Sequence, residues 1–288
     1  GANVRDVDKI KITDAVITSV AKTDDPRTQE ILTAVIRHLH DFVREVNLTS
    51  EEWQTAMGMF LKASKISDDI RNEFILFSDT LGVSSLVDLM AEDFSEGTEA
   101  SLLGPFYVEG APVLGYGASV IKDNDGIRTV MQGKITDLDG APIPGAVLDI
   151  WQNAANGLYQ VYDDSQDDDN LRFRTVSNEN GEYLFATIKP VPYPVPDDGP
   201  VGDMLRATNR HPLRTSHIHF KISKDGFKTL ITEVFPDDNP YLDEDSVFGV
   251  RESLITEFSE APRDETPAVT GVERPYCNVH FDFRLAPA

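Results

Sequence analysis

The sequence predicts a mainly β protein with α-helices, in which a helical N-terminal portion precedes an antiparallel β-sandwich. Two observations lead to this fold class. Apolar residues recur at spacings of three and four through roughly the first hundred residues, and short alternating runs between glycine and proline turns fill the rest. We expect a helical domain at residues 1–104 and a β-sandwich at residues 105–288 of the 288-residue chain.

Three segments of the N-terminal portion have the pattern of amphipathic helices. Residues 25–49 carry apolar side chains at helical spacing from Ile31 to Val43. Residues 49–66 begin with a threonine and a serine before two glutamates, which is a helix-start signature. Residues 69–94 continue the pattern, and Gly82 is expected to stop a helix within them.

The second portion contains short runs that alternate apolar and polar residues. Residues 130–153 predict a strand, a turn at Asp139-Gly140 and a second strand, and residues 174–188 predict a hairpin around Asn180-Gly181. Residues 216–223, 228–235 and 277–285 predict three further strands. Strands at this spacing are typical of an all-β sandwich.

The net charge of −23 and the sequence pI near 4.5 exclude nucleic acid as a partner, because an acidic chain repels phosphate backbones. The single cysteine, Cys277, excludes disulfides within the chain and all-cysteine metal sites, and we interpret it as a small buried apolar residue. The N-terminal stretch is charged throughout, and no apolar run approaches the roughly 20 residues of a membrane span. We therefore expect a soluble cytoplasmic protein.

Two histidines stand two residues apart in the predicted strand at residues 216–223. Side chains at positions i and i+2 of a strand point to the same side, so His217 and His219 share one face. This spacing indicates either a polar face or a pair of metal ligands, and by itself it leaves both open. The remaining histidines are expected in structural or surface positions: His38, His40, His211 and His280.

Two tyrosines have unusual local contexts. Tyr159 follows the turn at Gly157, and Tyr193 lies among four prolines at residues 190–196, which restrict the backbone. Each is either a packed aromatic residue with a hydrogen-bonded hydroxyl or a phenolate ligand. The pKa of free tyrosine is about 10, so only a strongly charged ion holds a phenolate at neutral pH. Ferric iron is the natural candidate.

Four ordered stretches resemble the intradiol ring-cleaving dioxygenases of aromatic degradation, and the likeness runs from about residue 30 to residue 285. The stretches are LLGPFYVEGAP (102–112), LDIWQNAANGLYQVYDD (148–164), NGEYLFATIKPVPYPVP (180–196) and RTSHIHFKIS (214–223). The resemblance implies a β-sandwich that carries non-haem Fe(III), and N-terminal helices that form a homodimer interface with bound phospholipid.

The same resemblance assigns roles to individual residues. It implies that Tyr159, Tyr193, His217 and His219 hold the iron, whereas Tyr162 and Tyr183 do not. Tyr193 is also expected to take a proton from the substrate, and Arg214 is expected to stabilise negative charge beside the substrate.

The stretch FILFSDTLGVSSLVDLM (74–90) is similar to the branch of the family that cleaves hydroxyquinol. In that case Leu76 and Asp79 face the ring, and Asp79 accepts a hydrogen bond from a third hydroxyl; otherwise Asp79 is only a helix-end residue before Gly82. At the position of Glu233, near the iron, the resemblance leads us to expect an uncharged polar residue. We assign Glu233 no role. The remaining pocket walls are expected from Leu103, Pro105, Phe106 and Val247.

The expected activity is cleavage of hydroxyquinol (benzene-1,2,4-triol) between its vicinal hydroxyls with O2. The product would be 3-hydroxy-cis,cis-muconate, which tautomerises to maleylacetate. Catechol or a chlorocatechol is the alternative ring. Two hypotheses lie outside the family: a non-catalytic transthyretin-like β-sandwich binding module, and a zinc hydrolase that uses His217, His219 and a carboxylate.

Overall fold

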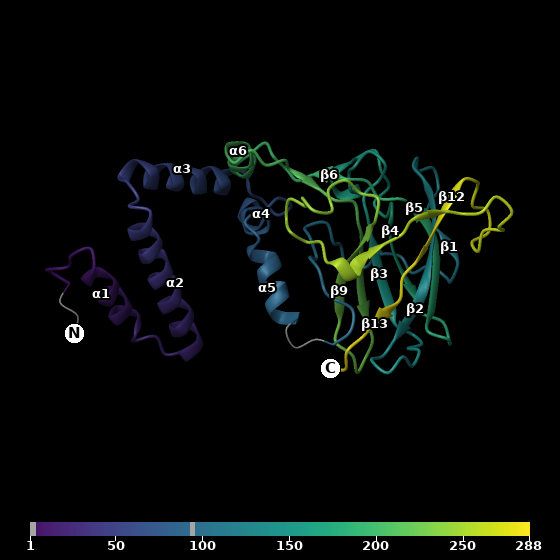
Figure 1. Cartoon of the computed structure of the whole chain (residues 1–288), viewed down its shortest axis with the longest axis horizontal. Helices are drawn as coiled ribbons and strands as arrows, with labels where there is room; N and C mark the ends of the chain where they lie inside the picture. Colours follow the sequence, from purple (N-terminus) through teal and green to yellow (C-terminus); the bar gives the residue numbers. More distant parts are fainter. Residues whose placement is uncertain (1–3, 93–95) are drawn as a thin grey trace. The chain divides into compact units, whose positions relative to one another are not determined.

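The computed structural model describes residues 4–92 and 96–288. Two compact units make up the chain: a helical unit, Gly1–Lys62, and a sandwich unit, Ala63–Ala288. The mainly β fold with α-helices confirms the predicted fold class (Figure 1). Residues 93 and 94, the end of the third predicted helical segment, lie outside the described residues.

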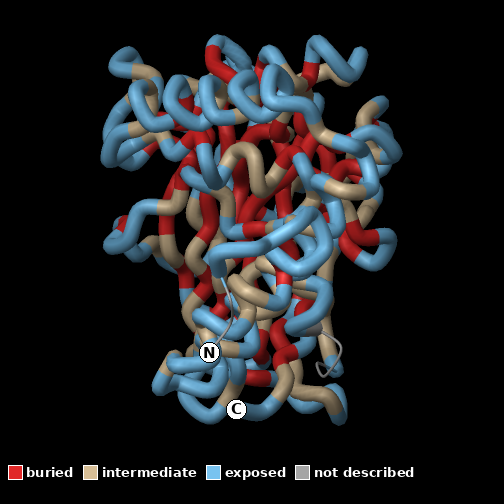
Figure 2. The backbone as a smooth tube through the Cα atoms, turned by 90° about the vertical axis from the view of Figure 1, so that its left-hand side faces the viewer, coloured by how far each residue is buried: buried red, intermediate tan, exposed pale blue. Residues whose placement is uncertain are grey.

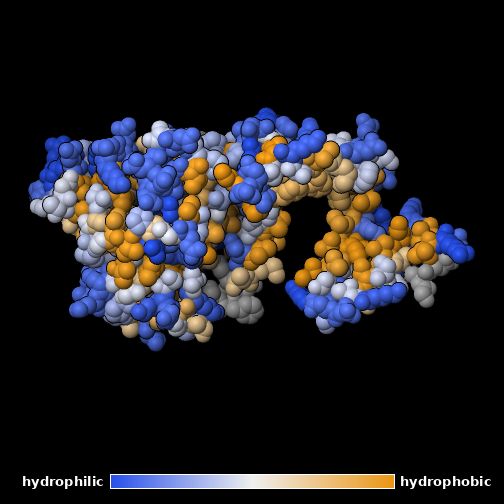
Figure 3. Space-filling view, turned by 180° about the vertical axis from the view of Figure 1, so that it is seen from behind, coloured by the Kyte–Doolittle hydropathy of each residue, from blue (hydrophilic) through white to orange (hydrophobic). Residues whose placement is uncertain are grey.

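The helical unit contains α1 (Lys11–Val20), α2 (Pro26–Glu45) and most of α3 (Ser50–Ile66). The predicted start of α3 is confirmed as a reciprocal cap: the Glu52 amide donates to the Thr49 hydroxyl over 3.2 Å, and the Thr49 amide donates to the Glu52 carboxylate over 2.9 Å. Large apolar side chains gather on the surface of this unit (Figure 3). The exposed ones on α2 are Ile31, Leu32, Val35, Leu39, Phe42 and Val43.

Three helices belong to the sandwich unit: α4 (Glu73–Thr80), α5 (Val83–Glu92) and α6 (Pro200–Ala207). Gly82 ends α4 as predicted, because it adopts a φ of +74° that side chains other than glycine rarely adopt. Among the described residues no single helix could cross a membrane by length and composition, but α4 and α5, bent by 70°, pass that test as a pair.

Two sheets pack against each other in the sandwich unit. One has the strand order β1-β5-β2-β12-β11 with β13 beside β2, the other has the order β10-β9-β8-β3-β4, and β6 pairs with β7 separately. The first sheet consists of β1 (Ala118–Ser119), β2 (Arg128–Thr136), β5 (Glu182–Ile188), β11 (Ser259–Glu260), β12 (Tyr276–His280) and β13 (Phe283–Arg284). The second consists of β3 (Val147–Trp151), β4 (Arg172–Val176), β8 (Ile218–Ser223), β9 (Leu230–Pro236) and β10 (Ile255–Thr256).

The pairing within the sheets is mixed. The central pairs β2–β5, β3–β8 and β8–β9 are antiparallel, whereas β1, β10, β12 and β13 each join a neighbour in parallel. The separate pair is β6 (Tyr193–Pro194) with β7 (Leu213–Arg214), and short 3-10 helices lie at Gln160–Tyr162 and Glu252–Leu254.

The two predicted hairpins are wrong as strand pairs. Both turns form, with Gly140 and Gly181 at positive φ, and the Gly140 amide bonds to the Asp137 carbonyl. However, β2 and β3 lie in different sheets, and so do β4 and β5. The turns carry the chain from one layer of the sandwich to the other, and local alternation cannot reveal this because both faces of a sandwich alternate.

The core fills the space between the sheets (Figure 2). Phe185 of β5 meets Phe220 of β8 with ring centroids 6.4 Å apart, so the two sheets contact each other through aromatic side chains. On β8, Ile218, Phe220 and Ile222 belong to this core. Cys277 is also buried in it, which confirms its interpretation as a small apolar residue.

Candidate metal centre and pocket

His219 of β8 and His217, the residue just before this strand, point away from the sandwich core. Because Ile218 and Phe220 face the core, the strand alternation turns His217 and His219 to the opposite face. Both rings are fully buried, and their Nε2 atoms lie 3.0 Å apart. The ring planes are nearly perpendicular, at 89°. The pair is therefore a convergent site rather than a solvated polar face.

Both predicted tyrosines reach the same place. The Tyr159 hydroxyl lies 3.3 Å from His217 Nε2. The Tyr193 ring centroid lies 5.5 Å from that of Tyr159 and 5.6 Å from that of His217. Tyr159 is delivered by the turn at Gly157, which has a φ of +83°, and Tyr193 by the short strand β6. Four residues from three distant parts of the sequence thus share one buried centre.

Burial keeps these four side chains uncharged without a metal. It raises the pKa of Tyr193 to about 12 and that of Tyr159 well above its ordinary value. Burial, together with the nearby Arg214 charge, lowers the pKa of His217 to about 3. Burial also places the pKa of His219 well below its ordinary value. Neutral imidazoles are ready to bind a metal, whereas the phenols need a strongly charged ion to become ionised.

The donor atoms fit a transition ion. His217 Nδ1 lies 2.7 Å from the Thr215 carbonyl oxygen, which can only accept, so this nitrogen carries the proton and Nε2 carries a lone pair. Two nitrogens that bind the same ion at about 2.1 Å, with an angle of about 90° between the two bonds, lie about 3.0 Å from each other. The observed separation of the two Nε2 atoms is 3.0 Å. Non-haem iron is therefore consistent with the residues present.

Glu233, to which the sequence analysis gave no role, is also at this site. His217, His219 and Glu233 form a buried cluster with ligand atoms within 4.8 Å of one another. Both oxygens of Glu233, however, accept from the Arg214 guanidinium, over 3.1 and 3.0 Å. Its Oε1 lies 3.5 Å from Nδ1 of His219. The other nitrogen of that ring, Nε2, is the one that faces His217. Glu233 Oε1 also lies 3.9 Å from His217 Nε2, so the carboxylate lies beside both imidazoles and is closer to His219.

Asp245 is a site residue that the sequence analysis missed. It contacts Arg214 through two atom pairs at 3.3 Å, on the side not taken by Glu233. It also accepts the backbone amides of Thr215 and Gly249, over 3.1 and 2.8 Å. Its signal in the sequence is weak, because an aspartate within the DEDS stretch at residues 243–246 looks like a loop residue.

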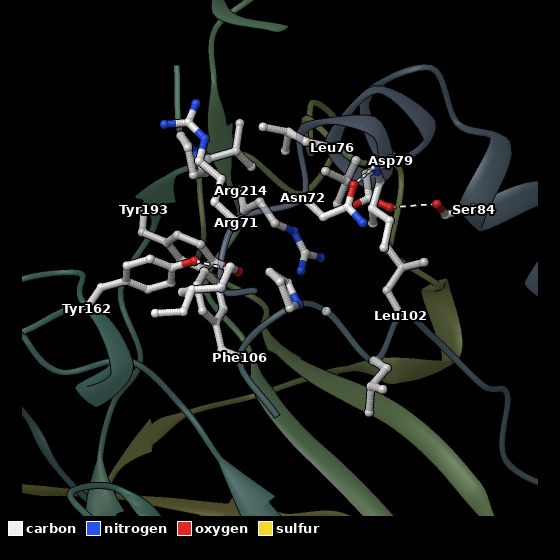
Figure 4. A pocket seen from close by; sticks show the side chains of 18 of the residues that line it. Arg71, Asn72, Leu76, Asp79, Ser84, Leu102, Phe106, Tyr162, Tyr193 and Arg214 are labelled. Atoms are coloured by element: carbon white, nitrogen blue, oxygen red, sulfur yellow. Dashed lines mark hydrogen bonds between the residues drawn. The ribbon is translucent and has the colours of Figure 1, made fainter. Parts of the chain in front are cut away.

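A cavity of about 310 Å³ adjoins this centre (Figure 4). Tyr193 and Arg214 line it, and so does every wall residue that the sequence predicted: Leu76, Asp79, Leu103, Pro105, Phe106 and Val247. Tyr162, which was not expected to bind metal, lines the cavity and donates to the Ile70 carbonyl over 3.2 Å. The lining that sequence analysis missed includes Arg71, Asn72, Ser84, Asp88 and Leu102.

Asp79 is more than a helix-end residue, because it faces this cavity from α4. The Ser84 hydroxyl donates to its Oδ1 over 2.6 Å and lies 2.8 Å from the Ser78 hydroxyl. The Asp79 side chain is partly buried, and this burial raises the pKa of its carboxyl group. Figure 4 shows Asp79 and Ser84 on one side of the cavity and Tyr162 and Tyr193 on the other.

Comparisons with known proteins agree with this site. A family model described as "Catechol dioxygenase N terminus" matches residues 25–99, and one described as "Dioxygenase" matches residues 102–287. The chain is 41% identical over 280 residues to a hydroxyquinol 1,2-dioxygenase of Nocardioides simplex, covering 96% of this chain and 95% of that protein. It is 44% identical over 256 residues to a 6-chlorohydroxyquinol 1,2-dioxygenase of Cupriavidus pinatubonensis, covering 88% and 93%.

A solved structure is similar over almost the whole chain. The crystal structure of a hydroxyquinol 1,2-dioxygenase from Pseudomonas putida DLL-E4 matches with a TM-score of 0.91 and 40% identity, covering 97% of this chain and 99% of that one. The chain therefore belongs to the intradiol ring-cleaving dioxygenase family, which confirms the resemblance seen in its four stretches. Within that family it is an enzyme similar to the hydroxyquinol 1,2-dioxygenases, which excludes the binding module and the zinc hydrolase.

Proposed function

We propose that this enzyme cleaves hydroxyquinol between its vicinal hydroxyls with O2, to give 3-hydroxy-cis,cis-muconate and, after tautomerisation, maleylacetate. The observation that carries the choice of ring is Asp79, a partly buried carboxylate that lines the cavity. A triol offers this carboxylate a third hydroxyl, whereas catechol leaves it without a substrate partner, at a cost in binding free energy. Relatives named as hydroxyquinol dioxygenases support the same choice.

We propose that Tyr159, Tyr193, His217 and His219 hold Fe(III). The support is their convergence: a phenol oxygen within 3.3 Å of one imidazole nitrogen, and two imidazole nitrogens 3.0 Å apart. A bound Fe(III) would supply Lewis-acid chemistry at this centre, which makes a vicinal diol reactive toward O2. Two phenolates suit a hard trivalent ion better than zinc, whose usual protein ligands are cysteine, histidine and carboxylates.

Tyr193 is the candidate proton acceptor. Of the four proposed ligands it alone lines the cavity described above, which places it next to a bound substrate. In the absence of a metal, burial raises the pKa of Tyr193 to about 12, so a Tyr193 phenolate that is not bound to the ion is a strong base. A substrate hydroxyl at this end of the cavity can pass its proton to Tyr193 as the diol binds.

Arg214 lies in the cavity wall together with Tyr193. The two residues are directly opposite each other in the β6–β7 pair. Its guanidinium is buried and fixed by Glu233 and Asp245. A fixed donor needs no reorganisation when negative charge develops on the substrate, so Arg214 is suited to stabilise that charge.

The helical portion, residues 1–104, is proposed to form a homodimer that also holds phospholipid. The support is the row of exposed large apolar side chains on α2, of which Leu39 is 57% exposed and Phe42 49%. Single folded chains rarely leave a contiguous apolar surface of this kind in water. Light scattering measures the assembly, and extraction followed by mass spectrometry identifies any lipid; a monomer without lipid contradicts this proposal.

Oxygen uptake with hydroxyquinol, catechol and 4-chlorocatechol, measured side by side on iron-loaded protein, tests the activity. We expect the highest kcat/KM for hydroxyquinol, together with a wine-red colour from tyrosinate-to-Fe(III) charge transfer. A higher kcat/KM for catechol or 4-chlorocatechol would assign the enzyme to the alternative ring. An active, iron-replete but colourless preparation would contradict the proposed ligands.

A further inference from the structure

We propose that Glu233 is a positioning residue of the metal centre, which fixes the proton of His219 on Nδ1 and makes the surroundings of the iron net negative. This inference rests on the proposed iron ligands and goes beyond them, since the resemblance predicts an uncharged residue at this position. It follows from the contacts of one fully buried carboxylate.

The pairing of β8 with β9 brings Glu233 to the site. Residue 233 lies directly opposite His219 in the antiparallel register, with its side chain on the same face. Its Oε1 lies 3.5 Å from His219 Nδ1 and 3.9 Å from His217 Nε2. Glu233 is the one ionisable side chain of β9, so it is the one carboxylate that this strand delivers to the centre.

His219 needs an acceptor on this side. Its Nδ1 is buried and has no hydrogen-bond partner of good geometry among the described residues, and the Leu102 backbone is the other group near enough to accept from the ring. A small movement of the ring toward Glu233 would bring Nδ1 and Oε1 within hydrogen-bond distance. A carboxylate that accepts from Nδ1 leaves the lone pair on Nε2 and makes the imidazole a stronger donor to a metal.

Glu233 also accepts hydrogen bonds from Arg214. Arg214 donates to both of its oxygens, and the Ser101 hydroxyl, whose proton goes to the Gly249 carbonyl over 2.7 Å, lies 3.3 Å from Oε2. A carboxylate can accept all of these bonds because it has about four lone-pair directions and no hydrogen. A glutamine would turn its NH2 group toward either Arg214 or His219, both of which are donors. Glutamate is therefore the residue that satisfies both neighbours.

The local charges do not cancel. One guanidinium, Arg214, is placed between two carboxylates, Glu233 and Asp245, so the buried group carries one net negative charge. Gly249 packs directly on it, since a Cβ there would lie 2.7 Å from an Arg214 nitrogen. Asp245 contacts Arg214 and two backbone amides, whereas Glu233 alone also faces His219. The two acids therefore have equal charge but different positions.

The difference between the two acids gives a matched experiment. We compare Glu233→Gln with Asp245→Asn; each removes one negative charge beside Arg214 with almost no change of shape. The affinity for ferric iron is measured by competition with a chelator, and the visible charge-transfer band is recorded on the iron-loaded proteins. Thermal unfolding of the metal-free proteins monitors the fold.

We expect Glu233→Gln to weaken iron binding about 10-fold or more, as loss of a partner of a metal-bound histidine does. Its charge-transfer band should move to longer wavelength, because a weaker His219 donor leaves the ion more electron-poor. Asp245→Asn should change both quantities less. Glu233→Asp keeps the charge but withdraws it from His219, so it should also weaken iron binding while shifting the band less than Glu233→Gln.

Wild-type affinity and band position in Glu233→Gln would overturn the proposal, as would equal losses in Glu233→Gln and Asp245→Asn. The first result would leave the Leu102 backbone as the acceptor for His219. The proposed function fails independently: iron-loaded wild-type protein would then lack the charge-transfer band or the oxygen uptake, whereas the ratio of iron affinities still tests Glu233.

Discussion

Replacing Asp79 with alanine is the sharpest test of how this enzyme selects its ring. The substitution removes the carboxylate that faces the cavity and leaves the metal centre untouched, since Asp79 comes from α4 and the four proposed ligands come from the sandwich. The hydroxyl at position 4 of the triol then loses its acceptor. Catechol has no hydroxyl there and loses nothing of this kind.

The magnitude follows from the surroundings of the carboxylate. A hydrogen bond to a charged acceptor contributes about 1.5–3 kcal/mol. Ser84 already donates to Oδ1 over 2.6 Å and shares the charge, so the lower half of that range applies. Since about 1.4 kcal/mol corresponds to a factor of 10, kcat/KM for hydroxyquinol should fall about 10- to 50-fold. The ratio of hydroxyquinol to catechol activity should fall by the same factor.

Steady-state oxygen uptake with both substrates measures this ratio. The matched control is Asp88→Ala on α5: Asp88 also lines the cavity, and burial also raises its pKa. A general loss of negative charge would act on both substrates alike in either variant, whereas a specific hydrogen bond would appear only in Asp79→Ala. Equal losses on hydroxyquinol and catechol in Asp79→Ala would refute the reasoning.

Three further predictions concern the metal centre and its supports. Tyr193→Phe should alter the visible band and lower turnover sharply, and an unchanged spectrum and rate would transfer its role to another tyrosine. Gly249→Ala should destabilise the protein by about 1–3 kcal/mol in denaturant unfolding through overpacking, because its Cβ would lie 2.7 Å from an Arg214 nitrogen. Gly115→Ala, with no atom within 4 Å, is the control, and equal losses would contradict the packing argument. Burial opposes ionisation of Asp245, but the Arg214 charge prevails and lowers its pKa below 3.8. Ionised Asp245 thus contributes stability above pH 3.8, and this contribution is lost as the pH falls through the pKa of the folded state. Metal-free Asp245→Asn should therefore lose less stability on acidification than the wild type. Parallel curves of unfolding free energy against pH would count against this.

Much of the local structure was predictable from the sequence, because it depends on short-range patterns. The cap at Thr49, the stop at Gly82 and the strand with His217 and His219 each follow from neighbouring residues. The strand order did not follow. The turns at Gly140 and Gly181 were expected to close hairpins, yet each leads into the opposite sheet, since pairing is chosen by packing across the whole sandwich.

The sequence by itself determined the chemical character of the site: two imidazoles on one face of a strand, two tyrosines held in restricted turns, and an aspartate on a helix near them. The tertiary structure decided which charges surround that site. Glu233 comes opposite His219 only through the register of β8 with β9, and Asp245 reaches Arg214 from 31 positions along the chain. Such neighbours are fixed by long-range pairing and burial, which no local pattern encodes.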